Sequence, residues 1–149
     1  MIRVVFIACR LVLGAVFLLA CVHKIVDPES FARAIANYQL VPGPLVHGLA
    51  ITLPWIEFVL AMALWFVPGF RKPAAALMGL MLIVFTGAMV INLARGLDIA
   101  CGCFTAREDP LGWGNVVRNL STLFVAGVVW GEDRLRHRFG LDRDQAGRA

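Results

Sequence analysis

Residues 74–93 read AAALMGLMLIVFTGAMVINL, a continuous stretch without a charged side chain. A helix needs about 17–25 such residues to cross the hydrocarbon core of a bilayer, where it satisfies its own backbone hydrogen bonds. The stretch therefore predicts a transmembrane helix. The rest of the chain agrees, because 60% of its 149 residues are hydrophobic and only 16% are charged, whereas soluble domains carry about 25% charged residues.

Three further apolar stretches have the length of a membrane span. They are about Val4–Val22, Leu49–Val67 and Trp113–Trp130. Turn-forming pairs such as Asp27-Pro28, Pro68-Gly69 and Asp109-Pro110 separate the spans. We predict an all-α fold, an integral membrane four-helix bundle, with residues 1–131 as the four-span membrane domain and residues 132–149 as a basic tail.

The basic residues predict the orientation, because short loops rich in Lys and Arg stay in the cytoplasm. One side of a four-span bundle would hold Arg3, Arg71, Lys72, Arg134, Arg136, Arg138, Arg143 and Arg148. Both termini are therefore predicted to be cytoplasmic, in a bacterial inner membrane. The first loop (about 23–48, with Lys24) and the third (about 96–112) are predicted to be extracytoplasmic. This orientation explains the net charge of +4. The sequence has no cluster of aromatic and basic residues of the kind that binds nucleic acid, so no nucleic acid partner is predicted.

A short interfacial helix is predicted in the first outer loop. Asp27 can cap such a helix and Pro28 can open it. Phe31, Ile35 and Tyr38 would then share one face. We expect this helix to lie along the outer membrane interface.

Three ionisable residues, Arg10, Glu57 and Arg118, fall inside predicted spans. Ionisable groups at membrane depth are costly, so they normally face the bundle interior and find partners. We expect Glu57 to pair with Arg10 or Arg118, either as a structural ion pair or with a role in proton handling or headgroup binding.

Other polar residues are expected to converge beneath the outer loops. Asn115, Arg118, Asn119 and Thr122 recur at helical spacing in the fourth span, and Asn92 and Arg95 end the third. In the first span, Arg10, Gly14, Phe17 and Cys21 share one face. Cys21 should therefore point inward at the outer end of its span, whereas Cys9 lies about 100° away and is expected to be a small packing residue.

The motif most informative about function is Cys101-Gly102-Cys103. Cysteines two residues apart can close a disulfide, and glycine tolerates the bent backbone. Such a tight ring is strained, which raises its reduction potential and suits electron exchange better than stabilisation of a fold. Two thiolates at this spacing also suit a soft metal such as Cu(I). No histidine lies nearby in sequence to complete a zinc site, and no resident metal site is predicted.

Several stretches resemble a known family. They are RLVLGAVFLLA at 10–20, Lys24, residues 31–38, LPWIE at 53–57, ARGLDIACGCF at 94–104, and Arg118-Asn119. Over about residues 3–130 the sequence resembles the MauE branch of the DoxX-like membrane proteins, and its cysteine segment is the most specific part. It departs from the commonest pattern at Thr105, where glycine often stands, and at Cys21, where small residues are usual.

The resemblance implies a membrane protein that helps to mature the small subunit of methylamine dehydrogenase, a disulfide-rich periplasmic client. It also implies a thioredoxin-like periplasmic partner. The helical layout of the family is similar to the DsbB and vitamin K epoxide reductase bundles, which implies a quinone as the electron acceptor.

Three functions remain open from the sequence. In the first, the chain is a thiol–disulfide oxidoreductase component: Cys101 and Cys103 cycle between dithiol and disulfide, and Cys21 is a candidate third thiol. The second is a non-enzymatic membrane scaffold or assembly subunit, and the third is delivery of a soft metal. The supporting polar or charged residues are predicted to be Arg10, Lys24, Glu57, Asn92, Arg95, Arg118 and Asn119, with Arg95 or Arg118 favouring the thiolate.

Overall fold

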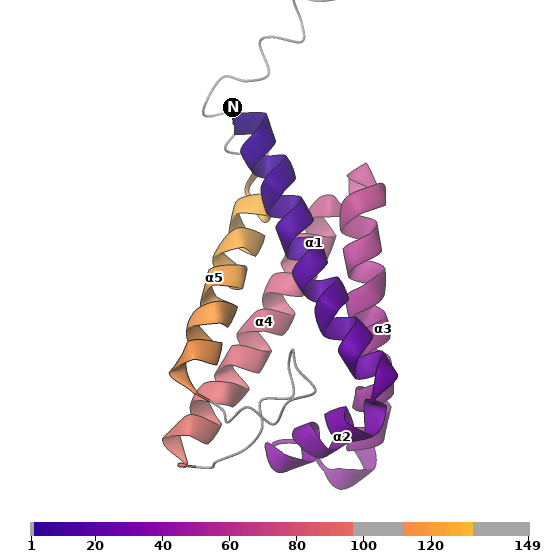
Figure 1. The fold of residues 1–149 in the computed structure, drawn as a ribbon, viewed down its shortest axis with the longest axis vertical. Coiled ribbons are helices and arrows are strands. Elements are labelled where there is room, and N and C mark those ends of the chain that lie inside the picture. The colour runs from indigo at the N-terminus through magenta and orange to yellow at the C-terminus, as the bar shows by residue number, and fades with distance from the viewer. Residues whose placement is uncertain (1, 97–111, 133–149) are drawn as a thin grey trace, which may run out of the picture.

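The computed structural model describes residues 2–96 and 112–132, with side chains from Val4 onward. Its elements are α1 (Ile2–Val26), α2 (Pro28–Asn37), α3 (Gly43–Phe66), the 3-10 turn η1 (Pro68–Phe70), α4 (Arg71–Ala94) and α5 (Trp113–Trp130). The four long helices form a bundle and the short α2 lies across one end of it (Figure 1). We call this the α2 end. The predicted all-α membrane bundle is confirmed.

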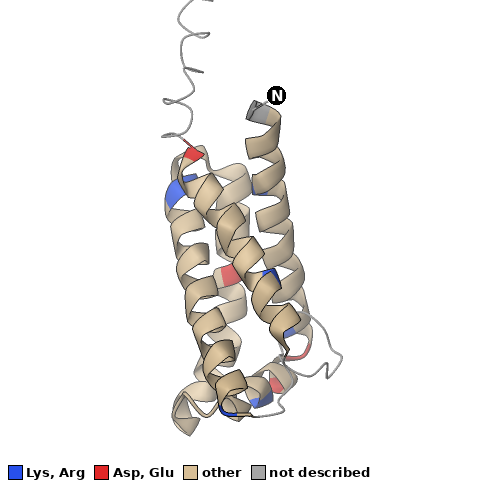
Figure 2. Cartoon of the chain, turned by 90° about the vertical axis from the view of Figure 1, so that its left-hand side faces the viewer, with Lys and Arg blue, Asp and Glu red and all other residues tan. Residues whose placement is uncertain are grey.

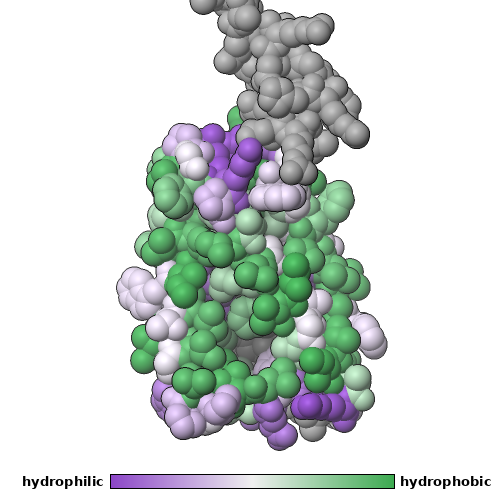
Figure 3. Space-filling model, turned by 180° about the vertical axis from the view of Figure 1, so that it is seen from behind, coloured by the Kyte–Doolittle hydropathy of each residue, from purple (hydrophilic) through white to green (hydrophobic). Residues whose placement is uncertain are grey.

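Three of the described helices are long and apolar enough to cross a membrane. They are Val4–Val26, Gly43–Phe66 and Pro68–Ala94. The fourth predicted span, α5, falls short because Asn115, Arg118 and Asn119 occupy its first half, but it runs beside α4 (Figure 1). Hydrophobic side chains cover the middle of the rear face, and hydrophilic ones gather toward the two ends (Figure 3). The chain is a multi-pass membrane protein.

The first loop is shorter than predicted, because α1 continues to Val26 and α3 already begins at Gly43. Nothing before Asp27-Pro28 stops α1, and Pro44 is tolerated in the first turn of α3, where no backbone N–H is needed. Lys24 therefore lies inside α1 and is buried. Its predicted place in the outer loop was wrong.

The predicted short helix in the first loop is present as α2. The Asp27 carboxylate accepts a hydrogen bond of 3.0 Å from the Ser30 backbone N–H and caps the helix. Hydrogen bonding by Ser30, through its side chain and its backbone, lowers the pKa of Asp27. Phe31 and Ile35 are buried against α3, so α2 is held on the bundle by its apolar face.

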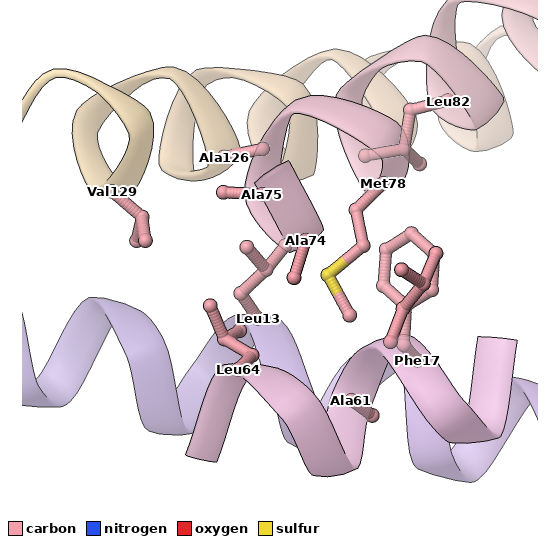
Figure 4. Packing of buried hydrophobic residues seen from close by; sticks show 11 residues of the cluster. Leu13, Phe17, Ala61, Leu64, Ala74, Ala75, Met78, Leu82, Ala126 and Val129 are labelled. Carbon is pink, nitrogen blue, oxygen red and sulfur yellow. The ribbon is translucent and has the colours of Figure 1, made fainter. Parts of the chain in front are cut away.

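The main core is formed by side chains from all four long helices (Figure 4). It lies in the half of the bundle away from the α2 end, near the last turns of α3 and α5 and the first turns of α4. Its members include Leu13 and Phe17 of α1, Ala61 and Leu64 of α3, Ala74, Ala75 and Met78 of α4, and Ala126 and Val129 of α5. The many alanines let the helix backbones approach closely, which is how membrane helices gain packing energy when the surroundings are themselves apolar.

One contact fixes how α1 and α3 sit against each other. The Trp65 indole N–H donates a hydrogen bond of 3.1 Å to the backbone carbonyl of Arg10, and the ring lies over Gly14. A Cβ atom at Gly14 would be 2.1 Å from Trp65 Nε1. Only glycine fits at this position without displacement of the indole ring.

Candidate functional site

A buried ion pair joins α1 to α3 inside the bundle. Lys24 Nζ lies 2.5 Å from Glu57 Oε1, and the two side chains are only 5% and 4% exposed. Most Lys, Arg, Asp and Glu positions lie nearer the ends of the helices (Figure 2). A charge pair at this depth costs desolvation energy, so it indicates a functional site.

Two aromatic rings enclose the Lys24 ammonium. Its nitrogen lies 4.8 Å from the centre of the Phe31 ring in α2 and 5.3 Å from the centre of the Phe85 ring in α4. Both distances are within the range of cation–π attraction. The ammonium is therefore held by three neighbouring elements, with Glu57 of α3 as its counter-charge.

A small cavity of about 30 Å³ adjoins this pair. Its walls are Phe17, Ala20, Lys24, Glu57, Met81, Leu82, Phe85 and Asn119. Glu57 Oε2 is buried and has no hydrogen-bond donor among the described residues. Among the residues that the structure describes, the Asn119 amide nitrogen makes only long contacts, 3.4 Å to Thr86 Oγ1 and 3.8 Å to Met89 Sδ. The site thus combines a charge pair with unused hydrogen-bonding capacity.

The predicted pairing of Glu57 with Arg10 or Arg118 was wrong. Arg10 forms an ion pair of 2.8 Å with Glu132 instead. The Arg10 backbone contacts Trp65, which follows Glu57 by eight residues, or about 12 Å along α3. Arg10 is therefore level with the far end of α3 and too distant from Glu57.

Of the other predicted polar residues, the asparagines are buried and the arginines are not. Asn92 is fully buried and its amide nitrogen donates to the Ala88 carbonyl at 2.9 Å, while its Oδ1 has no donor among the described residues. Asn119 is also buried, whereas Arg95 and Arg118 are exposed. Arg118 was expected to face inward, but it lies about 100° around α5 from the buried Asn119.

The two described cysteines differ in burial. Cys21 points inward as predicted, is fully buried, and donates a hydrogen bond of 3.2 Å from Sγ to the Leu18 carbonyl. Cys9 is half-buried against the main core, in line with its predicted packing role. Cys101 and Cys103 lie outside the described residues. The helix ends on either side of them, at Ala94 and Trp113, both lie at the α2 end (Figure 1).

A larger apolar pocket of about 360 Å³ lies between α2, α3 and α4. Its walls include Ile35 of α2, Tyr38 directly after α2, Leu53 of α3, and Val84 and Phe85 of α4. The rear face of the molecule is hollowed near the α2 end (Figure 3). Because Met81 and Phe85 also line the small cavity, these two side chains of α4 separate the apolar pocket from the ion pair. In the described ranges, no group of three His, Cys, Asp or Glu residues is placed to hold a metal ion.

Sequence reasoning missed the partner of Glu57, although one signal for it was present. Lys24 follows Phe17 by seven residues and Cys21 by three, so it continues the inward face of α1. Lys24 also lies near the end of an apolar stretch, where a lysine side chain usually extends toward the membrane surface. That position favoured a place in the outer loop over a buried one.

Comparisons with known proteins give one consistent result. A family model described as methylamine utilisation protein MauE matches residues 2–131. The chain is 34% identical over 124 residues to the methylamine utilization protein MauE of Paracoccus denitrificans, and 35% identical over 116 residues to that of Methylophilus methylotrophus. It is 34% identical over 114 residues to that of Methylorubrum extorquens.

These matches cover 82%, 73% and 74% of this chain, but only 66%, 60% and 61% of the respective relatives. The chain thus spans less than two thirds of the length of each relative. No solved structure matches the chain.

Proposed function

The chain belongs to the MauE family, and on this premise we propose that it is a membrane thiol–disulfide exchange component that matures a disulfide-rich extracytoplasmic protein of a methylamine utilisation system. The observation that carries the proposal is the family match over residues 2–131, which includes Cys101-Gly102-Cys103. The names of the relatives supply the pathway, and the cysteine pair supplies the chemistry.

The arrangement of the helices supports an extracytoplasmic location for the cysteine pair. The helices on either side of it meet the α2 end, whereas Arg71 and Lys72 begin α4 at the opposite end. If basic residues stay in the cytoplasm, the α2 end faces outward. The pair is then accessible to soluble proteins in an oxidising compartment, where disulfides persist.

The proposed exchange is balanced in atoms and electrons. A thiolate of the thioredoxin-like partner attacks one sulfur of the Cys101–Cys103 disulfide and forms a mixed disulfide. The second partner thiolate then displaces that sulfur. The partner leaves with a new disulfide, which it passes to the client, and Cys101 and Cys103 take up two electrons and two protons as a dithiol.

Restoring the Cys101–Cys103 disulfide requires an acceptor of two electrons. The family resemblance implies a quinone, and the pocket between α2, α3 and α4 fits such a group, because it is apolar and large enough for a substituted ring. Tyr38, Leu53 and Phe85 are among the side chains that would hold it. When bound, a quinone supplies the oxidising equivalents for the pair.

Differential alkylation of membranes, read by mass spectrometry, tests the proposal. We expect Cys101 and Cys103 to be oxidised and reducible by dithiothreitol. Cys9 should be a free thiol that reacts after denaturation, because it is packed against the core. Cys21 is fully buried, so in the folded protein it should react more slowly than after denaturation. As a third thiol it would be protected from alkylation only in the oxidised sample.

Substitution of the motif separates exchange from a scaffold role. Cys101→Ser should abolish maturation of the client, while Cys9→Ser, the matched control, should leave it intact. If Cys101 and Cys103 stay free thiols in oxidising membranes and Cys101→Ser still supports maturation, the chain is a scaffold subunit. Stoichiometric capture of Cu(I) by the reduced pair would instead indicate metal delivery.

The proposed orientation has its own test. Reporter fusions at Gly69 and Ala149 should behave as cytoplasmic, and a fusion at Ala106 as extracytoplasmic, because Arg71 and Lys72 accompany the first position and the basic tail the second. An alkaline phosphatase reporter is active only outside the cytoplasm, so activity at Ala149 would contradict an arrangement with both termini inside.

A further inference from the structure

We infer that the cavity beside Lys24 and Glu57 is a binding site for water inside the membrane domain. It holds one or two water molecules, which form hydrogen bonds with Glu57 Oε2 and with the side-chain amide of Asn119. The inference concerns the interior of the bundle and does not depend on the proposed redox function. It rests on the volume of the cavity, the polar atoms that face it and the charges that surround it.

The volume is right for water. A buried water molecule needs a cavity volume of at least about 10–15 Å³, and this cavity has about 30 Å³. A lipid chain or a ring is far too large for it. Larger apolar molecules have the separate pocket behind Phe85, with about 360 Å³.

The polar lining is also right, because a stable buried water needs two to four hydrogen-bond partners. Glu57 Oε2 is a buried carboxylate oxygen without a donor among the described residues. Asn119 is 3% exposed, and the contacts of its amide nitrogen to Thr86 and Met89, within the described part of the chain, are long. The Lys24 ammonium has three N–H donors and also lines the cavity. Leaving these groups unsatisfied would cost free energy that a water molecule recovers.

The charges argue for a neutral ligand instead of an ion. Lys24 of α1 and Glu57 of α3 face the cavity together and compensate each other. The Lys24 ammonium repels a cation, and the Glu57 carboxylate repels an anion. The other walls come from α1 with Phe17 and Ala20, from α4 with Met81, Leu82 and Phe85, and from α5 with Asn119, none of them charged. Among the described residues, the Cys21 thiol also interacts electrostatically with both members of the pair.

Radiolytic footprinting of the full chain in lipid nanodiscs tests the site, because X-ray radiolysis turns bound water into hydroxyl radicals that oxidise the adjacent side chains. Phe17 lines the cavity, whereas Phe6 of the same helix does not, and both are 4% exposed. We expect Phe17 to be oxidised several times faster than Phe6. Met78, fully buried in the main core, should stay unlabelled although methionine is the more reactive residue.

Variants then assign the label to this cavity. Asn119→Leu removes one partner of the water and should lower the oxidation of Phe17 to the level of Phe6. Asn115→Leu, a matched change on α5 away from the cavity, should leave it unchanged. If Asn119→Leu fails to fold, the comparison of Phe17 with Phe6 in the unsubstituted chain still decides. Equal oxidation of these two residues would show a dry cavity and overturn the inference.

Discussion

Replacing Glu57 by alanine is expected to lower the free energy of unfolding by about 3–5 kcal/mol, the usual cost of removing one partner from a buried ion pair. The Lys24 ammonium would remain 5% exposed, between the Phe31 and Phe85 rings, without a counter-charge. Glu57→Gln should cost clearly less, because the amide oxygen still accepts a hydrogen bond from Lys24. Thermal unfolding of the purified protein in detergent measures both changes.

Two controls make this result specific to the buried pair. Glu29→Ala breaks the pair with Arg33 on α2, whose side chains are 81% and 61% exposed, and should cost less than about 1 kcal/mol. Removing both charges with Lys24→Met and Glu57→Gln should recover much of the loss, because no uncompensated charge remains. Wild-type melting of both Glu57→Ala and Glu57→Gln would show that the carboxylate has no such partner.

Gly14→Ala is expected to destabilise the bundle by about 1–3 kcal/mol, the typical cost of overpacking. In an open helix the same change stabilises by roughly 0.5–1 kcal/mol. The sign reverses here because the new methyl group would lie 2.1 Å from Trp65 Nε1, and the ring is held by its hydrogen bond to the Arg10 carbonyl. The readout is again the melting temperature in detergent.

Gly87→Ala is the matched control, since a Cβ atom at that position of α4 meets nothing within 4 Å. It should be neutral or slightly stabilising. In a Trp65→Leu background the penalty of Gly14→Ala should shrink, because the ring that causes the clash is gone. Equal melting shifts for Gly14→Ala and Gly87→Ala would mean that the close approach of α1 to α3 is not tight.

Most of the fold could be predicted from the sequence because helix formation in a bilayer is a local matter. An uninterrupted apolar run must form a helix there, and Pro28, with Asp27 as a cap, both ends α1 and starts α2. The ends of the helices were less predictable. Pro44 falls within the predicted first loop (about 23–48), but it lies in the first turn of α3, where proline is favoured.

The pairing of charges could not be predicted, because it depends on how far each helix is shifted along its neighbour. Arg10 and Lys24 lie on the same face of α1, about 21 Å apart along its axis. Which of them meets Glu57 is set by packing between helices, such as that of Trp65 on Gly14. The sequence likewise does not separate Gly14, which is against an indole ring, from Gly87, which faces open space.

Asp27 alone separates α1 from α2, and backbone hydrogen bonds restrict movement at this connection. The Asp27 N–H donates to the His23 carbonyl at 3.2 Å, and the Phe31 N–H donates to the Asp27 carbonyl at 3.3 Å. Phe31 on one side of the connection covers Lys24 on the other. Mechanically, the hydrogen bonds across Asp27 make the two helices one bent, stiff unit. A force applied to α2 at the surface therefore becomes a torque on the helix segment that carries the buried ammonium.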